Sequence, residues 1–215
     1  MNKIVAIDGP AGSGKGTVAK ILANKLNLTY IDTGAMYRAI AYLTLKNNVD
    51  IKDEDKIIEL AKNSKIEFLN DKVYVNGEDV SSKIRTMEVT RIVSPISSIV
   101  KLREILVDLQ RNMANGLDVI MEGRDITTVV FPNATYKFYL DASIEERAHR
   151  RFKENSLKGM QVTYEEILEN IKKRDYNDMH KEVGALIKSD DAIYIDSTNL
   201  TIDEVVEKIK QIIEV

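Results

Sequence analysis

The stretch IVAIDGPAGSGKGT (4–17) passes from a continuous apolar run into a glycine-rich turn that ends in a lysine. It follows the phosphate-binding pattern G-x-x-x-x-G-K-[ST], with Gly9, Gly14 and Lys15 in register. The next position of the pattern calls for a hydroxyl residue, but this chain has Gly16, and the hydroxyl comes one residue later at Thr17. Helical periodicity follows the turn, so the stretch predicts a strand, a phosphate loop and a helix.

Glycines in such a loop let several backbone N–H groups converge on a phosphate chain, and Lys15 adds a point charge. Because Gly16 has no donor oxygen, either Thr17 reaches a Mg²⁺ ion or the substrate phosphates and waters hold it, and Mg²⁺ often keeps several of its waters. The G-K-G-T ending resembles the loops of nucleoside monophosphate kinases, and the chain lacks the N-K-x-D element of a GTPase switch. The residues expected to bind ATP are Gly9, Pro10, Ala11, Gly12, Ser13, Gly14, Lys15, Gly16 and Thr17.

The composition limits the classes of protein that remain. The chain has 215 residues, 44% of them hydrophobic, and a net charge of −3, which argues against general binding to nucleic acid or to membrane surfaces. It has no cysteine and only His149 and His180, which excludes thiol catalysis and Cys- or His-rich metal sites. The apolar run at the N-terminus is too short for a signal peptide or a membrane span. We therefore expect a soluble, cytoplasmic monomer.

Strand and helix patterns alternate along most of the chain. Apolar runs at 3–8, 28–32, 117–122, 135–141 and 191–197 suit strands buried on both faces of a parallel sheet. Helical stripes cover 18–26, 99–113 and 202–213, and three capping-box pairs mark helix starts: Ser143/Glu146, Thr163/Glu166 and Thr201/Glu204. The fold class predicted is α/β: a P-loop, doubly wound parallel sheet with flanking helices.

One segment departs from this alternation. Residues 65–80 alternate with period two, with turn signals at Asn70–Asp71 and Asn76–Gly77, which predicts a small antiparallel β insert. The insert either supports the domain or closes over a substrate. We expect a single kinase domain at 1–215. Its parts are a core (1–60, 86–145 and 183–215), an insert (61–85) and a helical region (146–182).

Four further stretches bear on the acceptor of the phosphoryl group: DTGAMYR (32–38), EGRDITTVVFPNA (122–134), ERAHRR (146–151) and KKRDYNDMHK (172–181). Helical spacing puts Arg147 and Arg151 on one face, and Arg174, Asp178 and Lys181 on another. Taken singly, such arginines often form solvated faces, and Arg124–Asp125 could be a local ion pair. Beside a phosphate loop, they favour a second anionic substrate, because transfer between two nucleotides needs many cations.

Together the stretches IDGPAGSGKGT, DTGAMYR, GRDITTVVFP, DASIEERAHRR and IKKRD resemble the bacterial cytidylate kinase family, from one end of the chain to the other. The resemblance implies a P-loop kinase in which the insert at 61–85 binds the monophosphate and the helical region at 146–182 is a mobile lid. The reaction it implies is ATP plus CMP or dCMP giving ADP plus CDP or dCDP, with Mg²⁺, in pyrimidine nucleotide metabolism.

The resemblance also implies roles for particular residues. Ser94, Arg103 and Asp125 would read the cytosine, which suits its N4 amino group and its acceptors. Arg38 and Arg124 would hold the CMP phosphate, and Arg174 and Asp178 the sugar. The full expected CMP site is Thr33, Tyr37, Arg38, Ser94, Arg103, Arg124, Asp125, Arg174, Asp178 and Lys181, and the catalytic residues are Lys15, Arg124, Arg147 and Arg151. No general base is expected, because a phosphate oxygen is already anionic.

The chain departs from the family pattern at three single positions and in the segment EVGAL (182–186), which replaces a more usual proline-containing turn. Lys181 stands where an arginine is usual, Glu122 where Asp is common, and Thr127 where glycine is usual. Lysine cannot make a forked contact, which bears on the sugar preference. The alternatives are a P-loop kinase for UMP, AMP or shikimate, or a non-catalytic nucleotide switch.

Overall fold

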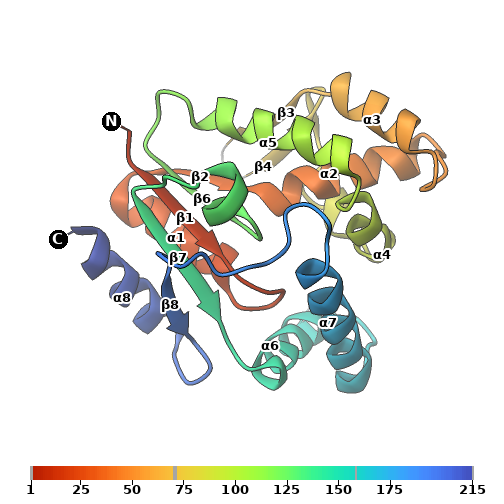
Figure 1. The fold of residues 1–215 in the computed structure, drawn as a ribbon. Coiled ribbons are helices and arrows are strands. Elements are labelled where there is room, and N and C mark those ends of the chain that lie inside the picture. Colours follow the sequence, from red (N-terminus) through yellow and green to blue (C-terminus); the bar gives the residue numbers. More distant parts are fainter. Residues whose placement is uncertain (1, 70–71, 158, 215) are drawn as a thin grey trace. The chain divides into compact units, whose positions relative to one another are not determined.

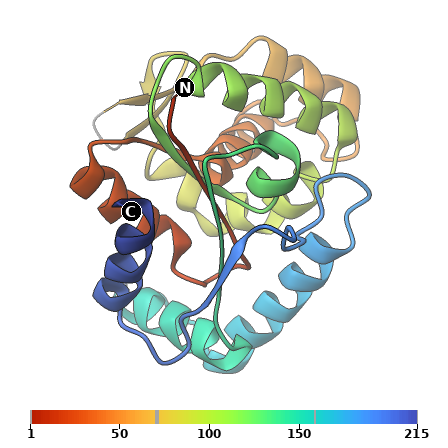
Figure 2. The same ribbon diagram turned by 60° about the vertical axis from the view of Figure 1, so that its left-hand side comes forward.

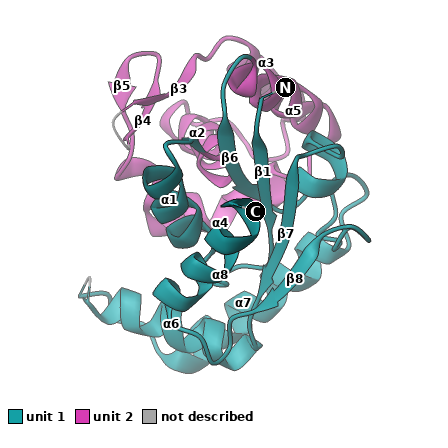
Figure 3. Ribbon diagram, turned by 90° about the vertical axis from the view of Figure 1, so that its left-hand side faces the viewer, with its two compact units in different colours: residues 1–30, 116–215 teal, residues 31–115 magenta. Residues whose placement is uncertain are grey.

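The computed structural model describes residues 2–69, 72–157 and 159–214 and divides the chain into two compact units. Unit 1 comprises residues 1–30 and 116–215, and unit 2 comprises residues 31–115 (Figure 3). The boundary falls inside the strand β2 (Thr29–Asp32), between Tyr30 and Ile31. Each unit is described by itself below.

Unit 1 is built on a parallel sheet. The strand β1 (Ile4–Asp8) lies between β6 (Val119–Gly123) and β7 (Tyr136–Asp141), and β8 (Ile193–Asp196) pairs with the far side of β7 (Figure 1). The full order is β2-β6-β1-β7-β8, and the pairs that involve β1 and β7 are parallel. Asp8, the last residue of β1, is in register with Gly123 and Tyr139. The predicted parallel α/β sheet is thus confirmed.

Helices α1 (Lys15–Leu26) and α8 (Ile202–Glu214) pack on this sheet through one apolar cluster. Val18 and Leu22 of α1 and Ile209 of α8 meet Ile7 and Phe138 of the strands, and all five side chains are fully buried. The helical stripes in the sequence predict these faces because residues at i, i+3 and i+4 share a side of a helix. Burial of each such side chain contributes about 1.5–3 kcal/mol.

The remaining helices of unit 1, α6 (Ile144–Leu157) and α7 (Tyr164–Met179), lie side by side (Figure 2). Both begin where the sequence predicts. Thr163 and Glu166 form a reciprocal capping box, and the Ser143 hydroxyl accepts a hydrogen bond from the Glu146 N–H. Between β6 and β7 the chain makes a π-helical turn, η2 (Ile126–Val130), which the sequence patterns did not predict.

Unit 2 holds most of its helices around one apolar core, with a small antiparallel sheet beside them. Its elements in order are α2 (Thr33–Lys46), α3 (Glu54–Lys62), β3 (Ile66–Leu69), β4 (Lys72–Val75), β5 (Glu78–Asp79), η1 (Lys83–Arg85), α4 (Met87–Ile96) and α5 (Val100–Ala114). The antiparallel insert predicted for 65–80 is confirmed, with Asn76 and Gly77 both at positive φ in the second turn. The first predicted turn, at residues 70–71, lies outside the described residues.

Candidate functional site: a buried cationic cluster at the phosphate loop

The phosphate loop joins β1 to α1 as the sequence predicts. Gly12 and Gly14 have φ of 81° and 87°, a region that side-chain-bearing residues rarely adopt, so the loop needs glycine there. Gly9 is required for a different reason, since a Cβ on it would lie 2.0 Å from the Leu140 carbonyl oxygen of β7. The Ser13 hydroxyl is buried and has no hydrogen-bond partner among the described residues. A buried orphan hydroxyl in this loop fits a phosphate oxygen as its partner.

The displaced hydroxyl of the loop has a steric explanation. A Cβ on Gly16 would lie 3.0 Å from the Glu122 carboxylate and 3.5 Å from the Tyr30 hydroxyl, so Glu122 occupies the space that a serine or threonine side chain would need. The Tyr30 hydroxyl donates a hydrogen bond of 3.4 Å to the same carboxylate. Thr17, in the first turn of α1, is exposed.

Lys15 is buried at the start of α1. Its Nζ donates to the Pro10 carbonyl (3.1 Å) and lies 3.9 Å from the Glu122 carboxylate. Burial, and next the positive charge of Arg124, lower the pKa of Lys15 to about 7. The ammonium is therefore held in a site that lacks enough negative charge, which an anionic ligand would supply.

Arg124, directly after β6, belongs to the same cluster. Its Nε donates to Asp178 of α7 (2.8 Å), and Lys181 Nζ lies 3.0 Å from the other oxygen of that carboxylate. Arg174 is on the same helix as Asp178. Burial, and next the positive charge of Arg124, lower the pKa of Arg174 to about 10. Burial opposes ionisation of Asp178, but Arg124, Lys181 and Arg174 outweigh it and hold its pKa far below the usual range.

These contacts bear on two interpretations of the sequence. Arg124 makes an ion pair with Asp178, 54 residues away in the sequence. Lys181 is not on a helical face with Arg174 and Asp178, because α7 ends at Met179 with His180 as its C-cap. The chain leaves the helix and still brings the Lys181 ammonium to Asp178.

The arginines of α6 contact the phosphate loop through its carbonyl groups. Arg147 is buried and donates to the carbonyls of Ala11 (3.0 Å) and Ala142 (2.9 Å) and to Asp175 of α7 (2.5 Å). Arg150, which belongs to the stretch ERAHRR but is not among the expected catalytic residues, donates to the Ser13 carbonyl (3.4 Å). Arg151 is partly exposed and pairs with Glu154 (2.9 Å). Helical spacing could not reveal the contacts of Arg147 with Asp175 and Ala11, since these residues lie 28 and 136 positions away.

Asp8 is a second functional candidate that sequence reasoning missed. This carboxylate ends β1 directly before the phosphate loop and is fully buried. It accepts hydrogen bonds from the segment that follows Arg124 and Asp125. The sequence signal that could have found Asp8 is a charged residue at the end of a continuous apolar strand, because such a residue needs buried partners.

Unit 2 carries the other residues that the sequence predicts to bind the nucleotide that accepts the phosphoryl group. Arg38 on α2 donates to the Ile84 carbonyl (3.2 Å) and to the Thr90 hydroxyl (3.0 Å). The Arg103 guanidinium lies 5.3 Å from the centroid of the Tyr37 ring, and it donates to the Ser97 carbonyl. Thr33 is buried in the first turn of α2, and Ser94 lies on α4. Within this unit, Tyr37 and Arg103 are thus brought into contact.

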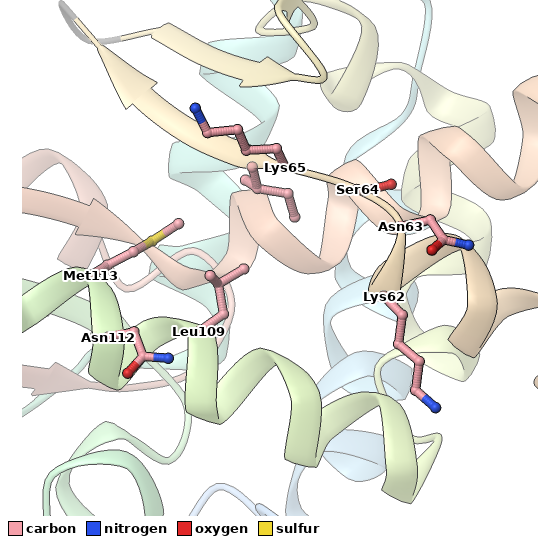
Figure 4. Close-up of a pocket in the computed structure, with 8 residues that line it drawn as sticks. Lys62, Asn63, Ser64, Lys65, Leu109, Asn112 and Met113 are labelled. Carbon is pink, nitrogen blue, oxygen red and sulfur yellow. The ribbon is translucent and has the colours of Figure 1, made fainter.

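A hollow of about 540 Å³ opens on unit 2 between the end of α3, the start of β3 and the end of α5. Its floor is apolar, with Leu109 and Met113, and the ammonium groups of Lys62 and Lys65 point away from one another (Figure 4). None of the residues predicted to bind ATP or CMP lines it.

Three kinds of comparison place the chain among known proteins. Residues 5–215 match the family model described as cytidylate kinase. Cytidylate kinase of Alkaliphilus oremlandii is 53% identical over 95% of this chain and 94% of its own length, and cytidylate kinase of Clostridioides difficile is 47% identical over 97% and 96%. Among solved structures, shikimate kinase of Bacteroides thetaiotaomicron has a TM-score of 0.51 at 13% identity, with 99% of each chain covered, which shows likeness of fold alone. The chain therefore belongs to the cytidylate kinase family.

Proposed function

We propose that this protein transfers the γ-phosphoryl group of ATP to CMP and dCMP, giving ADP and CDP or dCDP. The observation that carries the proposal is the buried cluster of Lys15, Arg124 and Arg174 at the phosphate loop, whose charge Asp178 and Glu122 only partly offset. Two anionic nucleotides would supply the missing negative charge. Membership of the cytidylate kinase family supports the choice of acceptor.

ATP would lie on residues 9–17. The orphan Ser13 hydroxyl and the left-handed Gly12 and Gly14 fit a phosphate chain, and the α1 N-terminus adds its partial positive charge. Mg²⁺ would be held by the phosphates, by water and by the exposed Thr17 hydroxyl. These donors fit, because they are the oxygen ligands that Mg²⁺ prefers and Gly16 offers none. The ion would supply charge neutralisation between the phosphates.

The CMP roles stay as the sequence predicts them. Ser94, Arg103 and Asp125 would read the cytosine. Arg38 and Arg124 would hold the monophosphate, Arg174, Asp178 and Lys181 would contact the sugar, and Thr33 and Tyr37 would complete the CMP site. The Lys181 ammonium already contacts Asp178, so it would act on the sugar together with that carboxylate. An ammonium makes single contacts where an arginine makes two, which would alter the preference between ribose and deoxyribose.

Catalysis in this account is alignment and charge stabilisation. Lys15 and Arg124 would stabilise the charge that develops on the transferred group, and no side chain needs to remove a proton from the acceptor phosphate. Arg151, partly exposed on α6, would exchange Glu154 for a phosphate oxygen. Arg147 would act from its buried position on the loop carbonyl of Ala11.

A helix that could cross a membrane is absent from the described ranges 2–69, 72–157 and 159–214. We place the protein in the cytoplasm, as a monomer in pyrimidine nucleotide metabolism, on its composition and family.

The cytosine reader is tested with Arg103→Ala and Asp125→Ala. Both should raise the KM for CMP strongly while the KM for ATP stays close to that of the wild type. Melting temperatures, measured alongside, identify a variant that fails to fold. Intact CMP phosphorylation in both variants would favour another small acceptor, and tight ATP binding without turnover in the wild type would favour a nucleotide switch.

A further inference from the structure

The Asp8 carboxylate ties the end of β1 to the segment that follows Arg124 and Asp125. Its Oδ1 accepts from the Ile126 N–H (2.9 Å), and its Oδ2 accepts from the Thr127 N–H (2.8 Å) and the Thr127 hydroxyl (2.7 Å). Asp8 is 0% exposed and Thr127 1% exposed. A buried carboxylate without such donors would be costly, so these three hydrogen bonds are what allow the charge to stay there.

The position of this contact links the two substrate loops of unit 1. Asp8 directly precedes Gly9, the first residue of the phosphate loop, and Ile126 and Thr127 directly follow Asp125. The Arg124 side chain is fixed separately, on Asp178. Asp8 therefore fixes the backbone that carries Arg124 and Asp125, relative to the strand that carries the phosphate loop.

The Thr127 hydroxyl adds a third bond where the family pattern has glycine. A glycine could give only its N–H to Asp8, so two of the three bonds would remain. The next residue, Thr128, differs sharply: its buried hydroxyl has no partner in the part of the chain that the structure describes. The two threonines are thus a matched pair on the same π-helical turn, only one of which reaches the carboxylate.

From this geometry we propose that Asp8 and the Thr127 hydroxyl form a latch that positions Arg124 and Asp125 for the acceptor nucleotide. Asp8 and Thr127 are positioning residues, since they act through the loop and do not touch the substrate. The proposal rests on the proposed function, because Arg124 and Asp125 are assigned to CMP there.

The latch gives a pH signature with a definite sign. Burial raises the pKa of Asp8 to about 6, while the bonds from Thr127 and Ile126 lower it. Three other titratable groups come from the elements around Asp8: the Asp125 carboxylate from the loop, the Tyr139 phenol from β7 and Glu122, beside Lys15, from β6. Below pH 6 a proton on the Asp8 carboxylate occupies one of its acceptor oxygens, so the loop that carries Arg124 and Asp125 loosens. Removal of the Thr127 hydroxyl raises the pKa of Asp8 further, so loosening should begin at higher pH.

The experiment compares Thr127→Val, Thr127→Ser and Thr128→Val in the full chain. Thr127→Val should raise the KM for CMP roughly tenfold while the KM for ATP changes little. Loss of one of the three donors to the buried carboxylate should also lower the melting temperature by a few degrees, with the protein still folded. The acid limb of its kcat/KM for CMP should move to higher pH. The CMP phosphate itself titrates near pH 6, but it is common to all variants and cancels in the comparison. Thr127→Ser should restore both values, and Thr128→Val should match the wild type.

A direct readout separates the latch from the kinase assignment. The carboxyl carbon of Asp8, followed by NMR over pH 4.5–8 without substrate, should titrate at higher pH in Thr127→Val than in the wild type. An unchanged pKa of Asp8 in Thr127→Val, or a rise of equal size in the KM for ATP and the KM for CMP, would overturn the latch. Absence of CMP-dependent ADP formation in the wild type would overturn the proposed function instead, with the NMR result unaffected.

Discussion

At the scale of single residues, Lys15 is the clearest case of a side chain poised for an anion. Its pKa is about 7 in the free protein, and ATP phosphates would raise it, so ATP binding should take up a proton at pH 8. ATP affinity should accordingly fall as the pH rises above 7. Calorimetry at pH 8 in two buffers of different ionisation enthalpy measures the uptake. Lys15→Met should abolish the proton uptake and lower kcat by ~10²–10³-fold. Lys25→Met, at the exposed end of α1, should change neither the proton uptake nor kcat.

Asp178 offers a second residue-scale prediction, on stability. It is the carboxylate that Arg124 and Lys181 share, so Asp178→Asn leaves buried cations without their counter-charge. The free energy of unfolding should fall by about 3–5 kcal/mol in urea titrations. Glu169→Gln on the same helix breaks only the exposed pair with Lys172 and should cost less than about 1 kcal/mol. Equal losses in the two variants would contradict the account.

At the scale of elements, the phosphate loop depends on its close approach to β7. Gly9→Ala sets a Cβ 2.0 Å from the Leu140 carbonyl oxygen, so a strand of the sheet or the loop itself must shift. Gly116→Ala is the matched control, since its φ is also positive (80°) but nothing lies within 4 Å of the added Cβ. Gly116→Ala should cost about 1–2 kcal/mol. Gly9→Ala should cost clearly more by thermal unfolding, and it should abolish ATP binding.

Most elements were predictable because their patterns are local. Apolar runs mark β1, β6 and β7, and the capping pair Thr163/Glu166 marks the start of α7. Elements with a mixed pattern were not predicted from the sequence; one of them is α4, which contains Pro95 inside the helix. In the site, the phosphate loop followed from its motif, but the contacts of Arg147 and Asp8 did not. Ala11, which Arg147 contacts, and Ile126, which Asp8 contacts, lie more than a hundred residues away from them in the sequence, where spacing carries no information.

At the scale of the whole molecule, we expect the lid to respond to both substrates. Residues 146–182 include α7 and most of α6, whose arginines and Asp178 belong to the proposed nucleotide sites. Closure on ATP and CMP would exclude water and so protect ATP from hydrolysis. Hydrogen exchange of residues 145–182 should slow with a non-hydrolysable ATP analogue plus CMP, more than with either alone. Exchange that is unchanged by the pair of ligands would contradict closure.

The cytidylate kinase activity is tested best by the initial rate of ADP formation from ATP–Mg²⁺ with CMP, dCMP, UMP, AMP and GMP offered separately. We expect CMP and dCMP to be phosphorylated far faster than the other three, and the ratio of their rates would report the effect of Lys181. A preference for another base would keep the kinase chemistry but contradict the cytosine reader of Ser94, Arg103 and Asp125. Turnover with none of the five would contradict the proposed function.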